Sequence, residues 1–100
     1  MESAYQFCLT LELKNRNLLV ETEVDQPIVY EGVLLTTGYR LDMLVENCVI
    51  IENKAIEKLL PIHQAQLLTY LRLRNLHLGY LINWHVPLIK DGINRMVHKL

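Results

Sequence analysis

Three charged residues interrupt two apolar runs near the middle of the chain, and their types could support metal-assisted chemistry. Asp42 lies inside the apolar run 41–45. Glu52 and Lys54 lie at the end of the run 48–54. A charge within an apolar run costs free energy unless it is paired or binds a metal. Three such interruptions close together indicate a candidate site.

The spacing of these residues lets them meet on one face of a β-sheet. Glu52 and Lys54 are two residues apart, so on a strand their side chains point to the same face, while Asn53 points to the other. If residues 46–47 form a tight turn, the two apolar runs pair as antiparallel strands. Asp42 then approaches Glu52 across the pair.

This group of residues has the composition of a divalent-metal site. Two carboxylates, from Asp42 and Glu52, and the backbone carbonyl of Asn53 are hard oxygen ligands that suit Mg²⁺ or Mn²⁺. The ammonium of Lys54 could orient or help deprotonate a water, or stabilise charge on a phosphate. Together these groups suit hydrolysis of a phosphodiester. The alternative is a plain ion pair between Asp42 and Lys54, which is the commoner arrangement when spacing alone is considered.

A polar stripe follows on the next predicted helix. Gln66 and Tyr70 are four residues apart and share a helix face, with His63 three residues before Gln66. The stripe can face the same cleft as Glu52, because the helix follows that strand directly. Alternatively, Gln66 faces solvent and Tyr70 belongs to the core. Glu2 has a similar ambiguity, as part of a frayed terminus or as a further carboxylate for the cleft.

Basic residues near the C-terminus are candidates for contacts with nucleic-acid phosphates. Lys90 and Arg95 are the main ones, beside Lys54 and Tyr70 from the central stretch. A solvated strand edge explains the C-terminal pair equally well. The four histidines match no zinc-binding spacing.

The elements that must position these residues follow from the periodicity of apolar positions. Helical spacing predicts helices over 2–16 and 58–75, the second with Pro61 in its first turn. Alternation, apolar runs and turn signals predict strands over 18–24, 28–30, 33–35, 41–45, 48–54, 76–84 and 93–97. The helix between 48–54 and 76–84 predicts that these two strands run parallel. The element order indicates an α/β or α+β sandwich with a mixed central sheet and a helix on each face, of which we expect α/β.

Composition places further limits on the protein. The chain has 100 residues, of which 51% are hydrophobic, which is enough for one domain over 1–100 with a real core. The net charge of −1 does not by itself indicate a nucleic-acid binder. Cys8 and Cys48 have apolar neighbours and no C-x-x-C spacing, which predicts reduced, packed thiols in a cytoplasmic protein. No leader is expected, and no apolar run approaches the ~20 residues that span a bilayer.

The ordered set of motifs resembles the GxxExxY proteins, a branch of the PD-(D/E)XK nuclease-like superfamily. The resemblance covers nearly the whole chain. Its main motifs are Glu2-Ser3-Ala4-Tyr5, Asp42, Glu52-Asn53-Lys54 and Gln66-Leu67-Leu68-Thr69-Tyr70. A lone ExK motif is weak, whereas the ordered set at these distances is specific for the family.

The resemblance implies a restriction-endonuclease-like core that uses Mg²⁺ or Mn²⁺ and acts on nucleic acid. DNA is expected ahead of RNA as the partner, although the sequence does not give the type of nucleic acid. Asp42 and Glu52 would be metal ligands and Lys54 the catalytic lysine. Gln66 and Tyr70 would match the helix motif of RecB-type exonuclease domains.

The chain departs from the family pattern in two places. Glu2 would match the first-helix carboxylate, but the glycine expected three residues earlier has no counterpart, because the chain begins at Met1. The N-terminal helix is therefore expected to be truncated. Asn53 stands where an apolar residue is usual, so its side chain needs polar partners under a helix.

These departures keep two further hypotheses open. One is a catalytically weak or inactive nuclease-fold protein that serves as a nucleic-acid or protein interaction module. The other is a homodimer formed through the apolar C-terminal strands and Trp84, because so small a chain gains stability from an interface.

Overall fold

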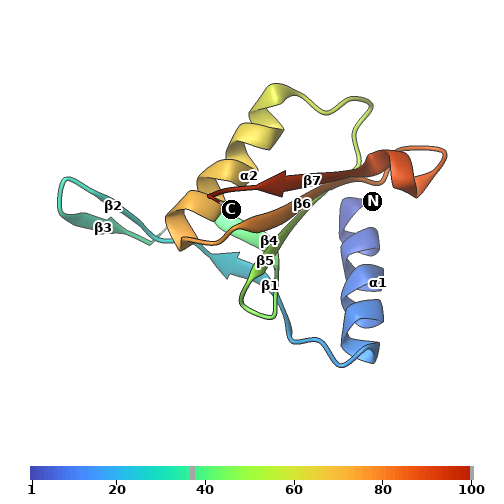
Figure 1. The fold of residues 1–100 in the computed structure, drawn as a ribbon, viewed down its shortest axis with the longest axis horizontal. Helices are drawn as coiled ribbons and strands as arrows, with labels where there is room; N and C mark the ends of the chain where they lie inside the picture. Colours follow the sequence, from blue (N-terminus) through green and yellow to red (C-terminus); the bar gives the residue numbers. More distant parts are fainter. Residues whose placement is uncertain (37, 100) are drawn as a thin grey trace.

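A mixed five-stranded sheet runs through the middle of the molecule in the computed structural model, which describes residues 1–36 and 38–99 (Figure 1). β5 and β6 run parallel, and the other neighbouring strands are antiparallel. The predicted α/β class with a mixed sheet is confirmed. The strand order is β1 (Val20–Asp25), β4 (Arg40–Val45), β5 (Val49–Lys54), β6 (Leu78–Asn83) and β7 (Ile93–Val97).

The two α-helices of the described chain cover opposite faces of this sheet. They are α1 (Glu2–Asn15) and α2 (Pro61–Arg74). Ile50 of β5 belongs to a core cluster that contains Leu67 of α2, whereas the next residue, Ile51, belongs to the cluster that α1 covers. Successive strand residues point to opposite faces, so the sheet lies between the helices. Neither helix is long and apolar enough to cross a membrane.

The second helix begins at Pro61, later than the predicted range 58–75. The backbone of Leu60 is extended, with φ −106° and ψ 158°, because a residue before proline is sterically disfavoured in the helical region. His63 then caps the helix start, since its Nδ1 accepts a hydrogen bond of 2.9 Å from the Leu60 N–H. The proline therefore sets the first turn of α2.

The segment between β1 and β4 leaves the sheet. β2 (Ile28–Tyr30) and β3 (Val33–Leu35) pair with each other as a separate two-stranded ribbon. Figure 1 shows the ribbon projecting away from the sheet. The sequence predicts both strands but not their separation from the sheet, because β4 pairs directly with β1 although β2 and β3 lie between them in the chain.

A tight turn joins β4 and β5, as the sequence predicts. The N–H of Cys48 donates to the Val45 carbonyl at 3.0 Å. Glu46 and Asn47 between them have φ values of 53° and 54°. Two central residues with positive φ match the twist of an antiparallel pair. The turn therefore determines which residues of β4 and β5 stand opposite each other.

The cysteine prediction is wrong in one respect. Cys8 and Cys48 are free thiols, but both are exposed rather than packed. Cys8 lies on the outer side of α1, and Cys48 closes the turn between β4 and β5. Leu9 and Val49, which follow the two cysteines, pack against the core, whereas Phe7 is itself exposed.

A close contact at Gly92 joins the 3₁₀ turn η1 (Ile89–Gly92) to the end of β6. A Cβ at this position would collide with the Asn83 carbonyl oxygen. We expect Gly92→Ala to lower the free energy of unfolding by about 1–3 kcal/mol, the usual cost of overpacking. Urea denaturation followed by circular dichroism measures the change.

The matched control is Gly32→Asn in the ribbon turn. No atom lies within 4 Å of a Cβ built at Gly32, and asparagine tolerates its φ of 77°. This variant should stay within about 0.5 kcal/mol of the parent, as surface changes usually do. Equal losses for Gly92→Ala and Gly32→Asn would show that the contact with Asn83 is not the cause.

Candidate active site

β4 and β5 stop pairing at the point where the two predicted carboxylates stand. Their register runs to Met43 opposite Ile51, which places Asp42 opposite Glu52 just beyond it. The Glu52 carboxylate accepts a hydrogen bond from the Asp42 backbone N–H at 2.8 Å. The Asp42 carboxylate accepts one from the Asn53 backbone N–H, also at 2.8 Å. Each carboxylate thus accepts a hydrogen bond from a backbone N–H of the neighbouring strand, in the place that a backbone carbonyl would occupy if the strands were still paired.

The surroundings of both carboxyl groups disfavour negative charge. Glu52 is only 4% exposed. Burial, followed by the charge of Asp42, raises the pKa of Glu52 to about 8. Burial also raises the pKa of Asp42, although the hydrogen bond from Asn53 acts in the opposite direction. Bringing a cation to this point would relieve the cost of ionising the pair.

Lys54 lies close to the two carboxyl groups without forming an ion pair with them. Its charge acts to lower the pKa values of both Asp42 and Glu52. Yet within the described chain the single ion pair at 4.0 Å or less is Arg40–Asp25. The structure therefore does not contain the plain Asp42–Lys54 pair that spacing alone would favour.

Gln66 of α2 reaches the same cleft as Lys54. Both side chains line a hollow of about 480 Å³ together with Tyr39 and His63. Among the described residues, neither carboxylate forms part of this lining. The helix thus places an amide beside the lysine, and the carboxyl groups are held at the strand gap.

Tyr70 is a core residue that also touches the site. Its ring is 2% exposed, and its hydroxyl accepts a hydrogen bond of 2.9 Å from Gln66 Nε2. The ring of Tyr39 packs edge-on against it, with centroids 5.7 Å apart. Burial first, and then the charge of Glu52, raises the pKa of Tyr70 to about 12. Tyr70 therefore keeps its proton and can hold Gln66 in place.

Asn53 faces the other side of the sheet, under α1, as strand alternation predicts. It is fully buried, and its Oδ1 accepts a hydrogen bond of 2.9 Å from Trp84 Nε1. Its Nδ2 donates to Gln6 Oε1 at 3.1 Å. The Trp84 ring stacks on Tyr5 with centroids 5.0 Å apart. The predicted need for polar partners is met, and the contacts tie α1 to the strand that carries Glu52.

Two further carboxylates lie within electrostatic range of the gap. The charges of Glu2, in the first turn of α1, and of Glu23, in β1, both act to raise the pKa of Asp42. Glu23 acts on Glu52 in the same way. Both side chains are exposed.

Sequence reasoning found Glu2 but missed Glu23. The register of β1 places Glu23 opposite Asp42, and Glu23 has a left-handed backbone with φ 54°. The alternation of acidic residues along β1 indicates only a solvated face. No sequence signal marks the neighbour across the strand pair.

The donors at the gap suit a divalent cation held by few protein groups. Within residues 1–36 and 38–99, no three His, Cys, Asp or Glu side chains converge as a metal site. Asp42 and Glu52 each have a second carboxylate oxygen. The Asn53 carbonyl lies on the same strand edge as its N–H, which faces β4. Mg²⁺ commonly binds through one or two carboxylates and keeps several waters, so this donor set fits it.

The two C-terminal basic residues are not brought to the gap. Arg95 stands opposite Tyr80, which packs in the cluster on the α1 side of the sheet. Glu52 lies on the α2 side, two residues after Ile50. Lys90 is exposed in η1, beyond the end of β6.

Comparison with known proteins gives one match. A family model described as the PD-(D/E)XK nuclease superfamily matches residues 1–96, which is nearly the whole chain. No curated protein and no solved structure matches the chain. The match does not distinguish the GxxExxY branch from the rest of the superfamily.

The raised pKa of Glu52 predicts a specific pH dependence of stability in metal-free buffer. The carboxyl group has an ordinary value of 4.5 and a folded value of about 8, so between these values the folded state holds the extra proton. The free energy of unfolding should therefore fall as pH rises from about 4.5 to 8, by on the order of 1 kcal/mol per pH unit. Urea denaturation across this range, with a chelator present, measures the slope.

Glu52→Gln should flatten most of this slope, because glutamine has no proton to lose. Glu12→Gln, on the exposed side of α1, is the matched control and should keep the slope of the parent. If the parent gained stability between pH 5 and 8, the burial of Glu52 would not have the assigned effect.

Proposed function

The chain belongs to the PD-(D/E)XK nuclease superfamily, and from this membership we propose that it is a metal-dependent phosphodiesterase that cleaves nucleic acid. We propose DNA ahead of RNA as the substrate. The observation that carries the proposal is the pair of carboxylates, Asp42 and Glu52, held across the strand gap beside Lys54. Cation ligands can activate a water and neutralise phosphate charge, and a charged amine beside them can stabilise the charge that develops during hydrolysis of a phosphodiester.

Each residue of the site has a distinct part in the proposed reaction. Asp42, Glu52 and the Asn53 carbonyl would hold Mg²⁺ or Mn²⁺. When bound, such a cation supplies an activated water and neutralises charge on the phosphate. The Lys54 ammonium would orient the attacking water or donate to a phosphate oxygen. Gln66, held by Tyr70, would position the substrate in the cleft that it shares with Lys54.

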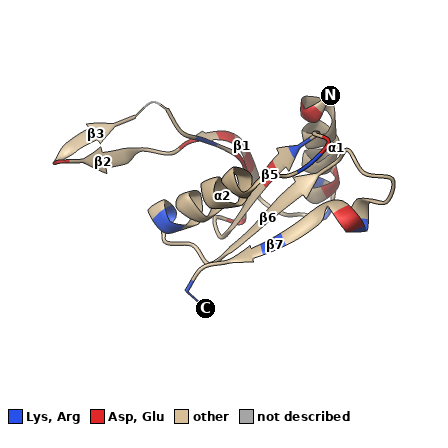
Figure 2. Cartoon of the chain, turned by 90° about the horizontal axis from the view of Figure 1, so that it is seen from above, with Lys and Arg blue, Asp and Glu red and all other residues tan. Residues whose placement is uncertain are grey.

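The surface beside the site suits a nucleotide chain. A second hollow, lined by Asp25, Arg40 and Tyr39 among others, adjoins the first because Tyr39 lines both. Tyr39, which is 37% exposed, could stack on a base, while Lys54 in one hollow and Arg40 in the other contact phosphates. Charges of both signs are scattered over the rest of the chain (Figure 2), so binding would depend on this local group.

A non-catalytic nucleic-acid-binding module is the second candidate. It is favoured because Asp42 and Glu52 each commit one oxygen to a backbone N–H. Among the described residues, no third side chain joins them as a metal ligand. This candidate predicts nucleic-acid binding that weakens with salt and no cleavage.

Cation binding can be tested without any substrate. Mn²⁺ should raise the melting temperature of the parent, and more at pH 8.5 than at pH 6, because protons compete for the Glu52 carboxyl group. Asp42→Asn should lose the shift. Asp91→Asn, an exposed residue of η1, should keep it. The metal-site assignment fails if Mn²⁺ leaves the melting temperatures of both the parent and Asp91→Asn unchanged. It also fails if Mn²⁺ raises the melting temperature of Asp42→Asn as much as that of the parent.

Cleavage tests the role of Lys54. With Mg²⁺ or Mn²⁺, the parent should cut single- or double-stranded DNA, and a chelator should stop the reaction. Lys54→Ala should lower the rate by about 10²–10³-fold, the usual effect of removing one group that stabilises the transition state.

Lys58→Ala is the matched control, because Lys58 is an exposed lysine just before α2. It should cleave at the parental rate. Lys54→Ala should also keep the Mn²⁺ shift, which separates chemistry from cation binding. Salt-sensitive binding with no cleavage by the parent would instead establish the second candidate.

A further inference from the structure

The cleft of about 480 Å³ that contains Lys54 combines apolar and polar side chains. Tyr39 and Ile62 are its large apolar members, and Ile62 is 65% exposed. His63 and Gln66 are polar members, and Lys54 carries a positive charge. Ligand pockets of about 300–1,000 Å³ commonly have this mixture, in which apolar surface supplies affinity and a few polar groups orient the ligand. The cleft therefore has the size and the lining to take one nucleotide.

The ring of Tyr39 is already held in place by the protein. Its partner Tyr70 is a core residue, and the two rings meet at 73° with their centroids 5.7 Å apart. In such an edge-to-face pair the partner covers at most one face of each ring. The Tyr70 hydroxyl accepts a hydrogen bond of 2.9 Å from Gln66, so the pair is anchored on α2.

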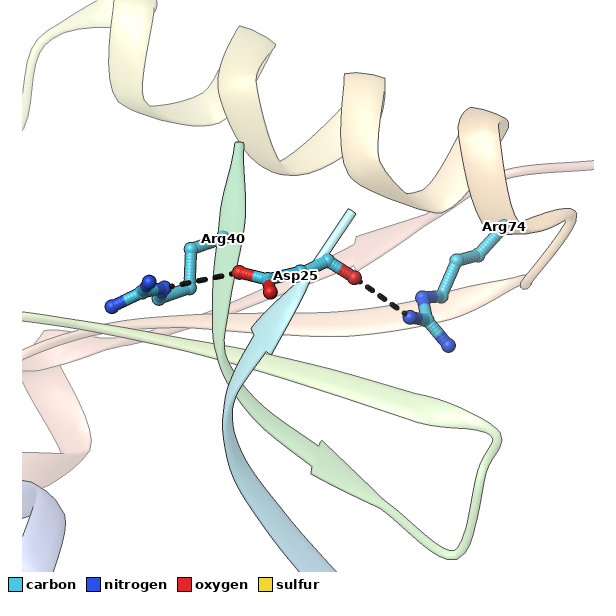
Figure 3. Close-up of polar contacts among 3 residues, drawn as sticks. All are labelled: Asp25, Arg40 and Arg74. Carbon is cyan, nitrogen blue, oxygen red and sulfur yellow. Dashed lines mark hydrogen bonds and ion pairs between the residues drawn. The ribbon is translucent and has the colours of Figure 1, made fainter. Parts of the chain in front are cut away.

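The backbone at Tyr39 is fixed as well. Its carbonyl accepts a hydrogen bond of 2.9 Å from the N–H of buried Gln26, whose Oε1 accepts one of 2.7 Å from Arg74 Nε. Arg74 Nη2 also donates to the Asp25 carbonyl at 3.3 Å, and Arg40 Nε lies 3.4 Å from the Asp25 carboxylate (Figure 3). These contacts join β1, β4 and the end of α2. Tyr39 is thus a platform that needs little ordering when a flat ligand binds.

The same contacts leave little positive charge for a nucleic-acid backbone. Among the described residues that line the two adjoining hollows, the lysines and arginines are Lys54 and Arg40. The Asp25 carboxylate beside Arg40 offsets part of its charge and repels a phosphate. Proteins that hold a duplex by its backbone neutralise many phosphates, on the order of 6–10. Affinity at this cleft must therefore come largely from stacking.

Stacking on Tyr39 requires a base with an open face. In a duplex, neighbouring base pairs cover both faces of each base, and turning one base out costs the energy of unstacking and unpairing. The bases of a single strand are free of this cost. Aromatic side chains stack on them with little dependence on sequence.

We propose that the cleft takes one unpaired nucleotide, with its base stacked on Tyr39 and its phosphate beside Lys54, and that the substrate is single-stranded DNA. Ile62, from the first turn of α2, would add an apolar contact to the base. The inference rests on the proposed function and deepens it by naming the class of substrate.

Binding without cleavage tests the inference. A labelled oligonucleotide of about 12 nucleotides is long enough to cover the site. With a chelator at pH 6.5, where Glu52 keeps its proton because its pKa is raised to about 8, the strand is not cut and meets less negative charge. Fluorescence anisotropy should show the single strand binding roughly tenfold or more tightly than its blunt duplex. Two phosphate contacts should give a slope of about −1.4 for log affinity against log salt.

Variants at two tyrosines locate the stacking. Tyr39→Ala should weaken single-strand binding by roughly tenfold or more. Tyr39→Phe should bind several-fold more tightly than Tyr39→Ala, because phenylalanine keeps the ring face. Tyr30→Ala is the matched control, because Tyr30 is an exposed tyrosine of β2 that does not line the cleft. It should bind as the parent does.

Ile62→Glu covers the case in which Tyr39→Ala fails to fold. Ile62 lies in the first turn of α2, where an acidic side chain is favourable to a helix. The new charge should weaken single-strand binding by roughly tenfold, because it lies beside the phosphate site. Leu11→Glu makes the same change at an exposed residue of α1, on the opposite face of the sheet, and should leave binding within about twofold because salt screens distant charges.

A parent that binds the duplex as tightly as the single strand, or binds neither, would overturn the inference. So would equal losses for Tyr39→Ala and Tyr30→Ala, or for Ile62→Glu and Leu11→Glu. A parent that prefers the single strand but does not cut it with Mg²⁺ supports this inference and refutes the proposed cleavage. A parent that cuts the blunt duplex as fast as the single strand refutes this inference and leaves the proposed cleavage standing.

Discussion

The molecule depends on a reciprocal exchange between two carboxylates and two backbone N–H groups where β4 and β5 separate. A strand that leaves its neighbour exposes backbone donors, and a buried donor without a partner costs free energy. Glu52 accepts from Asp42 and Asp42 accepts from Asn53, so the carboxylates satisfy these donors. The same bonds bring two acidic groups together in a poorly solvated place. The feature that completes the sheet is therefore also the one that would attract a cation.

The surrounding elements support this gap from both faces of the sheet. On the α1 side, buried Asn53 links β5 to Gln6 and Trp84, so the position of the Glu52 strand follows that of the first helix. On the α2 side, Tyr70 holds Gln66, whose amide stands beside Lys54. Groups that face the candidate site and groups that hold the fold thus alternate along single elements of this chain of 100 residues.

The ribbon of β2 and β3 (residues 28–35), called the arm, and the candidate site share their supporting strands. They meet at Tyr39, which lies at the root of the arm and lines the cleft. The arm lies between β1 and β4, and its root is fastened by Arg40 and Arg74. The carboxylates lie further along β4 and β5. Tyr39, at the root of the arm, lines the cleft that contains Lys54.

Local periodicity is enough to predict the strands, the turn at 46–47, the parallel step through α2 and the faces of Glu52, Lys54 and Asn53. The contacts that these side chains make depend instead on how the chain folds. The tertiary structure directed the carboxylates to backbone N–H groups rather than to Lys54, placed Glu23 beside Asp42 and put Arg95 on the opposite face. It also separated the arm from the sheet and left both cysteines exposed. Periodicity specifies which way a side chain points, whereas what it meets depends on segments far away in the chain.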